Sequence, residues 1–490
     1  MEQLEVDTIL EVMKTMRSSG SGGESREVSV KERKFAEHIV GVIKRIAASS
    51  KHEWIEEEEL YSVEPPENID LNVIYDALES FDYDYIRNVI DWKERNPKIN
   101  FKTLQKQFPR VTNSSYIAKF RAYLERMALN REKYTAISEF VWSRYREAQD
   151  SKYPVHDEDL KRWAFEKARE VELDGFKACD VWVENFKKRN FIGVRKTTEV
   201  ITYNNEHDTA ETEVLAAEFL MNFKLNSRFE PSEIFNAAQT SCAYEITIED
   251  ETSDDPIGSQ KTELRTYSIQ LIINMDGELC NNFMIVFQQC SDEQEDLIIP
   301  PNIYITSSDN GKVDKDALKN WATICLSPNL EREACLLISP VGTQRVQNSI
   351  FSLPDKKLTI KLLPTGSAAI LQPLSVLIFK QWKLFIKKFM QRVSLDQIPL
   401  KLNDKNSIIK LNFLIHNQLR APLFKPLIRN AWAKAGFEVE KEPDISIDSI
   451  LDKPDCGCQM GDCHSASFIN CAHCRHHICA FHFFSTFHHH

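Results

Sequence analysis

Cysteine and histidine residues are concentrated at the C-terminal end of the chain. Six of the 12 cysteines and eight of the 13 histidines follow residue 455, including a Cys471/Cys474 pair and a Cys479/His482 pair. Such close pairs hold tetrahedral Zn²⁺ in proteins. We therefore predict a zinc module over 451–490, structural because the ligand set leaves no open position, with one ion or two in a cross-brace. The predicted ligands are Cys458, Cys463, Cys471, Cys474, Cys479, His482 and one of the final histidines, assigned as His488.

The overall composition is that of a globular protein from a reducing compartment. With 490 residues, of which 42% are hydrophobic, we expect two to four domains with ordinary cores. The chain has no run of about 18 apolar residues and no N-terminal charged segment followed by an apolar one. We therefore expect no membrane span and no secretory signal, and a cytosolic or nuclear compartment in which cysteines are mostly thiols or metal ligands. Of these two compartments we predict the nucleus.

Residues 1–80 are interpreted as a flexible, partly helical N-terminal region. Ser18–Gly23 is rich in glycine and serine, which is typical of a tether. Residues 31–46 have apolar spacing that fits one docking helix. The acidic stretch Glu53–Glu67 is interpreted as a linker.

Positive charge is concentrated in one part of an acidic chain. The net charge is −12, yet residues 101–200 carry 21 Lys and Arg against 15 Asp and Glu. A basic segment in an acidic protein indicates a nucleic-acid-binding region, although lysine-rich helical surfaces also occur without a ligand.

Two helical units follow each other in this basic region. In the first, 81–128, a short helix ends before Pro109 and a second begins near Asn113–Ser115. This order fits a helix-turn-helix, in which the second helix enters the major groove, or an ordinary three-helix bundle. The candidate base contacts are Ser114, Ser115, Lys119 and Arg121.

The second unit, 129–197, ends in a basic cluster. Trp163, Trp182 and Phe186 have helical spacing and are expected in its core. The basic residues at its end are predicted to contact DNA phosphates. They are Lys187, Lys188, Arg189, Arg195 and Lys196.

The second unit also resembles a known DNA-binding module. The run PVHDEDLKRWAFEKARE with FKACDVWVENFKKRNFIGVRK is similar to the CENP-B-type helix-turn-helix. In that family it is the second half of a bipartite DNA-binding region, so the first unit then resembles the Psq-like half. The resemblance implies that double-stranded DNA is a partner.

Residues 198–450 are expected to form an α/β domain. Apolar runs at 267–274, 283–288 and 334–338 predict strands, and helical patterns alternate with them. The segment resembles the RNase H-like domain of pogo/Tigger-type transposases, notably at Tyr267–Gly277 and Gln372–Ser375. The expected fold is therefore multidomain, with tandem helix-turn-helix bundles, an RNase H-like α/β domain and the zinc module.

The resemblance also implies where a nuclease site would lie. Such nucleases use three carboxylates to hold two divalent metal ions. At the corresponding positions this chain has Ala238, Ser339 and Ser375. Neutral side chains are poor ligands for hard cations. We therefore expect no catalytic metal, and we considered Glu245, Glu249, Asp250 and Asp276 as substitute acids.

The sequence leads to a main hypothesis and two alternatives. The main hypothesis is a transposase-derived DNA-binding protein without nuclease activity that forms a homodimer and has no small-molecule substrate. One alternative is an active transposase or endonuclease that uses other acids. The other is a protein-interaction scaffold.

Overall fold

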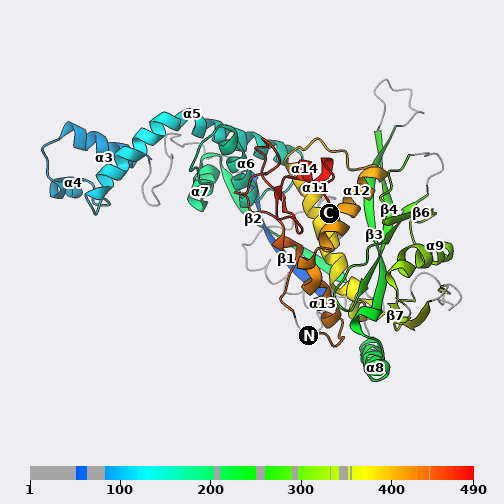
Figure 1. Cartoon of the computed structure of the whole chain (residues 1–490). Helices are drawn as coiled ribbons and strands as arrows, with labels where there is room; N and C mark the ends of the chain where they lie inside the picture. The colour runs from blue at the N-terminus through cyan, green and yellow to red at the C-terminus, as the bar shows by residue number, and fades with distance from the viewer. Residues whose placement is uncertain are drawn as a thin grey trace, which may run out of the picture.

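A helical arm projects from an α/β body in the computed structural model (Figure 1). The structure describes residues 51–62, 83–203, 210–249, 260–289, 296–331, 333–340, 351, 353, 356–440 and 442–490. The predicted tether and docking helix of the N-terminal region lie outside these residues. No helix in the described part of the chain is long and apolar enough to cross a membrane.

Three helices make the outer part of the arm. They are α3 (Tyr83–Arg95), α4 (Phe101–Gln107) and α5 (Ser115–Asp150). The Asn100 side chain caps α4 by accepting a hydrogen bond from the Thr103 amide at 3.0 Å. Apolar residues from all three helices form a small separate core, which includes Ile86, Leu104 and Phe120.

Helix α5 is longer than the sequence pattern suggested. It runs without interruption for 36 residues, which is about 54 Å at 1.5 Å per residue. The predicted boundary between residues 128 and 129 therefore falls inside a helix and is wrong. The first half of α5 belongs to the outer unit and the second half to the inner unit, so one continuous helix connects the two (Figure 1).

The inner unit contains the second half of α5, α6 (Asp157–Glu170) and α7 (Asp180–Arg189). Trp163, Trp182 and Phe186 are buried in its core, as predicted. The rings of Trp182 and Phe186 stack with centroids 5.4 Å apart.

Part of the acidic stretch that was predicted to be a linker forms one strand of a two-stranded ribbon. Strand β1 (Lys51–Ser62) pairs antiparallel with β2 (Ile192–Tyr203), from Lys51 opposite Tyr203 to Ser62 opposite Ile192. Glu58 lies opposite Lys196 and Glu59 opposite Arg195, and opposite charges across strands stabilise such pairing. The linker interpretation is therefore wrong for the part up to residue 62, and β2 continues past the predicted boundary at residue 197.

The body is built on a six-stranded mixed sheet of order β6-β5-β4-β3-β7-β8. The strands are β3 (Ile234–Glu249), β4 (Gln260–Asn274), β5 (Phe283–Gln288), β6 (Ile303–Ser308), β7 (Glu333–Ile338) and β8 (Lys357–Leu362). Strands β3, β4 and β5 are antiparallel neighbours, and β7 runs parallel to both β3 and β8. This arrangement resembles the RNase H-like transposase fold and confirms the predicted strands.

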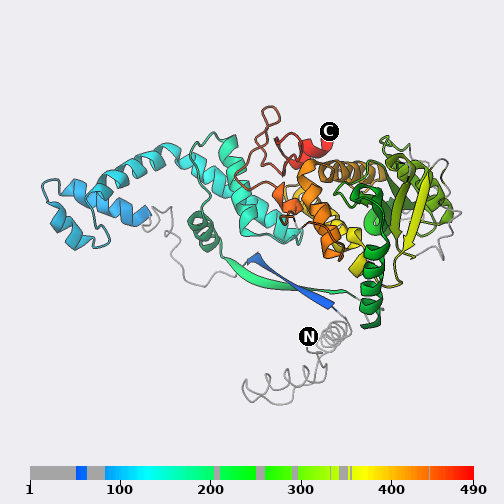
Figure 2. The ribbon, with the colours of Figure 1, turned by 60° about the horizontal axis from the view of Figure 1, so that its bottom comes forward.

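Helices cover both faces of the sheet (Figures 1 and 2). One face carries α9 (Lys315–Trp321), and a helical turn of 322–326 continues it. The other face carries the longer helices and the C-terminal segment. The helices of the body beyond α9 are α8 (Ala210–Asn226), α10 (Ala368–Leu371), α11 (Phe379–Leu395), α12 (Lys405–Leu419), α13 (Lys425–Lys434) and α14 (Ala480–Ser485).

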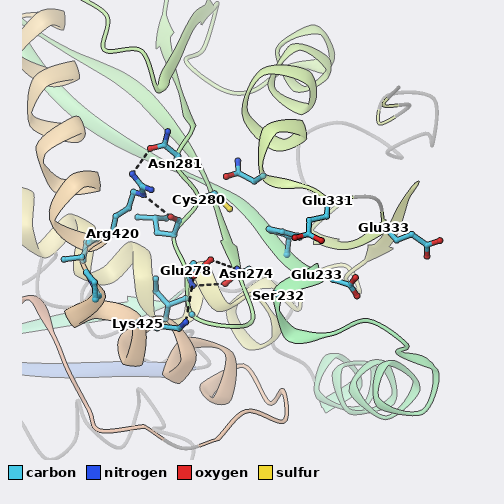
Figure 3. Close-up of a pocket in the computed structure, with 18 residues that line it drawn as sticks. Ser232, Glu233, Asn274, Glu278, Cys280, Asn281, Glu331, Glu333, Arg420 and Lys425 are labelled. Carbon is cyan, nitrogen blue, oxygen red and sulfur yellow. Dashed lines mark hydrogen bonds and ion pairs between the residues drawn. The ribbon is translucent and has the colours of Figure 1, made fainter. Parts of the chain in front are cut away.

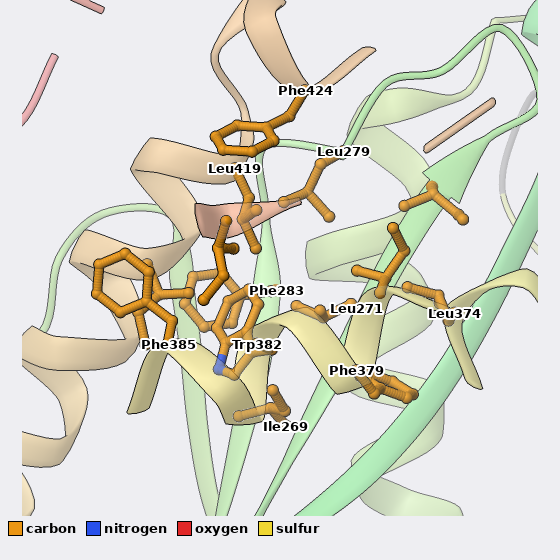
Figure 4. Close-up of a cluster of buried hydrophobic side chains, with 14 of the residues drawn as sticks. Ile269, Leu271, Leu279, Phe283, Leu374, Phe379, Trp382, Phe385, Leu419 and Phe424 are labelled. Atoms are coloured by element: carbon orange, nitrogen blue, oxygen red, sulfur yellow. The ribbon is translucent and has the colours of Figure 1, made fainter. Parts of the chain in front are cut away.

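Alternating side chains along each strand supply both cores. Ile269 and Leu271 of β4 point to the larger core, whereas Ile272 points to the core under α9. In the larger core, Phe283 lies against the fully buried Trp382 of α11 (Figure 4). Each core therefore uses one face of the same strands.

The C-terminal segment shares the core of the body. The aromatic rings of Phe468 and Phe483 pack on Phe385 and Phe389 of α11. Because these rings are buried together, residues 451–490 pack as part of the body and are not a separate domain.

A buried carboxylate joins the arm to the body. Asp396, just after α11, accepts hydrogen bonds from Arg162 Nη2 at 2.9 Å and Trp163 Nε1 at 2.8 Å, both on α6. Arg392 of α11 lies 3.6 Å from its other oxygen. Burial raises the pKa of Asp396, but the two arginines outweigh burial and leave the pKa below its ordinary value.

Replacing this carboxylate should weaken the junction. We expect Asp396→Asn to lower the free energy of unfolding by up to about 3–5 kcal/mol, because it removes one of the two carboxylates paired with Arg162 and the carboxylate beside Arg392. The contribution of Asp396 to the free energy of unfolding should be present at neutral pH. It should be lost as the pH falls through the lowered pKa that Asp396 has in the folded protein. Urea denaturation measures both effects. The control is Asp444→Asn, because Asp444 is an 82% exposed ion-pair partner of Lys434. This variant should lower the free energy of unfolding by only about 0–1 kcal/mol. Equal losses of stability in the two variants would contradict this account.

Candidate functional sites

The three positions expected to be acidic in a nuclease meet in one small cavity. Strands β3 and β7 run parallel with Ala237 opposite Ile338, so Ala238 and Ser339 follow side by side. Ser375 lies in the helical turn Leu374–Ile378 that leads into α11. All three line a cavity of about 170 Å³ at this edge of the sheet. The sequence placed these positions together correctly.

Buried amide side chains hold the helix against the sheet at this point. Asn236 donates to Leu337 O at 3.1 Å and accepts from Leu374 N at 3.2 Å. Gln372 donates to Ala237 O at 3.0 Å and accepts from Ser375 Oγ at 3.1 Å. Asn236 and Gln372 are nearly inaccessible to solvent, so these bonds fix the position of Ser375 in the cavity.

The cavity has neutral chemistry. Among the described residues that line it, none has a carboxylate, imidazole or thiol side chain. Its polar side chains are Gln239, Gln270, Ser339, Gln372 and Ser375. Mg²⁺ and Mn²⁺ sites are built on carboxylate oxygens, which these residues do not supply.

Of the four substitute acids considered from the sequence, Asp276 has a described side chain, and it does not fill this role. Asp276 is bound by Lys425 Nζ at 2.8 Å and Arg429 Nη2 at 2.7 Å, and the hydrogen bonds from these two residues lower its pKa. It therefore serves as an ion-pair partner between the β4 turn and α13. The side chains of Glu245 and Glu249, and the whole of Asp250, lie outside the described residues.

A larger cavity of about 580 Å³ lies at the opposite ends of β3 and β7 (Figure 3). Glu233, Glu278 and Glu333 line it together with Arg420 and Lys425. Figure 3 shows these carboxylates spread around the cavity rather than pointing at one another. Among the described residues, no group of side chains close enough to hold a metal ion lies there.

Two compact groups of cysteine and histidine side chains lie in the C-terminal segment. The first contains Cys458, Cys463, Cys479 and His482. The second contains Cys471, Cys474, His488 and His490. Pairs along the chain alternate between the groups, which is the cross-brace order. The seven predicted ligands all fall in these groups, and His490 is an eighth residue that the sequence assignment missed.

Distances within both groups fit the edges of a tetrahedron around zinc. Zn–S bonds of about 2.3 Å and Zn–N bonds of about 2.0 Å give edges of about 3.8 Å for S–S, 3.5 Å for S–N and 3.3 Å for N–N. Cys463 and Cys479 have sulfurs 4.0 Å apart, and Cys458 Sγ lies 3.5 Å from His482 Nδ1. In the second group, His488 Nε2 lies 3.4 Å from Cys474 Sγ and 3.3 Å from His490 Nε2.

Helix α12 supports the second group from outside. Gln418 donates to Cys471 Sγ at 3.4 Å and accepts from Ala472 N at 2.8 Å. Asn417 O lies 2.8 Å from His473 Nε2, and Asn417 Oδ1 accepts from His490 N at 3.2 Å. The sequence analysis gave these residues no role, although buried polar residues on an otherwise apolar helix are a signal for such contacts.

A third group, Asp452, Cys456 and His477, does not have the same geometry. The Asp452 carboxylate lies 2.8 Å from His477 Nδ1, which is shorter than the edge of about 3.3 Å expected between oxygen and nitrogen ligands of one zinc ion. Ser467 also donates to this carboxylate. The contact is therefore a hydrogen bond that braces the segment.

The start of α5 presents the predicted base contacts to solvent. Ser114, Ser115, Lys119 and Arg121 are all exposed. Residues two apart on a helix differ by about 200°, so Lys119 and Arg121 lie at opposite edges of the exposed face. Ser115 and two alanines, Ala118 and Ala122, occupy its middle. The face therefore has small residues along its centre and a cation at each edge, and the exposed Glu125 adds a negative charge about one turn further along the helix.

Several predicted phosphate contacts in the inner unit have internal partners instead. Lys187 is buried and contacts Asp157 at 2.9 Å and Glu184 at 2.7 Å. Burial would lower the pKa of Lys187, but these hydrogen bonds outweigh it and raise the pKa. The prediction for Lys187 is therefore wrong, because the residue fills a structural role.

The other four predicted phosphate contacts differ in their availability. Arg195 on β2 is exposed but binds Glu59 through two nitrogens, at 3.0 and 3.1 Å. Lys196 is exposed opposite Glu58, and Arg189 is half-buried with its Nε donating to Asn185 O at 3.4 Å. Lys188 is exposed at the end of α7. Of the five, Lys188 is the best placed for an external anion.

Comparison with known proteins finds one family. Residues 271–432, about a third of the chain, match the family model described as DDE superfamily endonuclease. This segment includes Ser339 and Ser375 but begins after Ala238. No match was found among curated proteins.

Solved structures with some likeness are complexes of Mos1 transposase. The Mos1 mariner paired end complex with Mn aligns with a TM-score of 0.25 and 9% identity, covering 73% of this chain and 98% of that chain. A pre-cleavage Mos1 transpososome aligns with a TM-score of 0.23 and 10% identity, covering 74% of this chain and 99% of that chain. These values are too low to support any further conclusion.

Proposed function

We propose that this chain is a transposase-derived DNA-binding protein whose RNase H-like domain does not cleave DNA. The observation that carries the proposal is the cavity at Ala238, Ser339 and Ser375, in a domain that matches the DDE superfamily. From the resemblance to pogo/Tigger-type transposases, a two-metal site would lie at this cavity. Its described side chains are neutral and cannot hold two divalent ions about 4 Å apart.

DNA binding is assigned to the helical arm. The exposed face at the start of α5 has small residues in its centre, which allow close approach to base edges, and cations at its edges for the phosphates. The arm contains the segments that resemble Psq-like and CENP-B-type units. In this assignment Ser114 and Ser115 face the bases, whereas Lys119, Arg121 and Lys188 contact phosphates.

The arm should bind duplex DNA in a salt-dependent way. We expect Lys119→Ala and Lys188→Ala each to weaken binding to random-sequence duplex and to make the negative slope of log K against log salt shallower by about 1, because each removes one phosphate contact. Lys187→Ala should instead lower the thermal stability of the arm, since Asp157 and Glu184 lose their partner. Gel retardation across a salt series, with thermal melting of each variant, measures these effects.

The matched control is Lys434→Ala. This cation is half exposed on α13 and pairs with Asp444, away from the arm. It should leave both affinity and salt slope unchanged. Wild-type protein that retards no duplex at low salt would contradict the proposal and favour the interaction scaffold.

We also propose that the two cysteine and histidine groups each hold one structural zinc ion. Support comes from the tetrahedral edge lengths and from amide donors to sulfur, including Cys479 N to Cys458 Sγ at 3.3 Å and His482 N to Cys479 Sγ at 3.4 Å. Such donors stabilise thiolate charge. Zinc would fix the fold of the segment, since all four ligands at each site come from protein.

Metal analysis of purified protein tests the zinc assignment. We expect two zinc ions per chain, about one in Cys471→Ser and two in Cys179→Ser, because Cys179 is an exposed thiol just before α7, outside both groups. Chelation should also lower the melting temperature of the body, since Phe468 and Phe483 pack on α11. Wild-type protein with fewer than two zinc ions would contradict the assignment. The homodimer and the nuclear location stay predictions.

A further inference from the structure

Three large apolar side chains of helix α8 face away from the body, with the exposed Glu218 beside them. Val214, Met221 and Leu225 are 56%, 59% and 73% exposed. Their spacing of seven and four residues puts them on one face of the helix. An exposed row of large apolar side chains on a helix indicates a surface that another element covers.

The opposite side of α8 is firmly packed. Phe223 meets Phe437 edge to face at 5.4 Å, and Phe219 and Leu220 pack on the larger core. A Cβ placed on Gly436 would lie only 2.6 Å from Leu220 Cδ1. Because α8 is held this closely by the body, turning it to bury the outer row would break existing contacts. The outer row therefore needs a separate partner.

A segment of the same chain has the matching pattern. Within residues 31–46, Phe35, Ile39, Val42, Ile43 and Ile46 recur at helical spacing. Residues 35–46 carry two Lys or Arg and one Glu, a charge of +1 that rises to +3 when residues 31–34 are included, whereas α8 carries three Glu and one Lys, a charge of −2. The segment therefore matches the exposed face of α8 in its apolar pattern and is opposite to α8 in the sign of its charge.

The β1–β2 ribbon brings this segment close to α8. Lys51 pairs with Tyr203, so the chain entering β1 lies beside the chain that leads to α8. Ile46 is five residues before Lys51, at most about 18 Å of extended chain. In both views the Lys51 end of the ribbon lies toward α8 (Figures 1 and 2). A tether this short gives a high effective concentration of the segment at α8.

We propose that residues 35–46 form an amphipathic helix that docks on the exposed face of α8 at Val214, Met221 and Leu225. The docked helix covers the apolar row and fastens the N-terminal region to the RNase H-like body. The proposal concerns packing within one chain and does not depend on DNA binding.

Hydrogen exchange on the full-length protein tests the docking. In wild type, amides of 36–46 should exchange at least about tenfold more slowly than in Met221→Asp/Leu225→Asp. Both substituted residues are exposed, so the body should keep its melting temperature. The matched control is Ile298→Asp, which changes a 79% exposed apolar residue elsewhere on the body and should leave the protection intact. The reciprocal variant Ile39→Asp/Ile43→Asp should give the same loss at 36–46.

Three results would overturn the proposal. The first is absence of protection at 36–46 in wild type. The second is protection that survives Met221→Asp/Leu225→Asp, which would place the segment elsewhere. The third is a halving of molecular mass by light scattering in that variant, which would assign the face to a second copy of the chain.

Discussion

Asp396 is the carboxylate that holds the helical arm against the α/β body. It lies at the end of α11 and accepts hydrogen bonds from Arg162 and Trp163 of α6, while Arg392 approaches its other oxygen. Charges buried this deeply stabilise a structure only when each one has its partners. The contact therefore defines how α6 sits on the body, and the long helix α5 carries that orientation to the outer unit. The placement of both helical units relative to the sheet depends on this junction.

Amide hydrogen bonds hold the helix start against the sheet at the cavity lined by Ala238, Ser339 and Ser375. Asn236 and Gln372 bind backbone groups of β7, β3 and the helix start, so the geometry of the corner depends on amide hydrogen bonds and apolar packing. Carboxylates at Ala238, Ser339 and Ser375 would add repulsion there without a metal ion to neutralise them. Neutral residues at the three positions therefore suit a domain kept for its fold.

The strands of the sheet and the cysteine and histidine groups were predictable, because they follow from the spacing of residues close together in the sequence. Alternating apolar residues located β4, β5 and β7, and close cysteine and histidine pairs located seven of the eight side chains in the two tetrahedral groups. Contacts between distant segments were not predictable. Lys187 looked like one more cation in a basic run, and only the folded inner unit brings Asp157 to it. Glu58 and Glu59 looked like linker residues because their partners on β2 lie well over a hundred positions away.

The central claim is that the body has the position of a nuclease site without its chemistry. The direct test is cleavage of plasmid DNA by the full-length protein with Mn²⁺ or Mg²⁺, followed over time at protein concentrations that saturate binding. The account predicts that the plasmid stays intact, with no metal-dependent nicking, both for wild type and for Asp276→Asn. Metal-dependent cleavage by wild type, abolished by replacing an acid of the body, would contradict it.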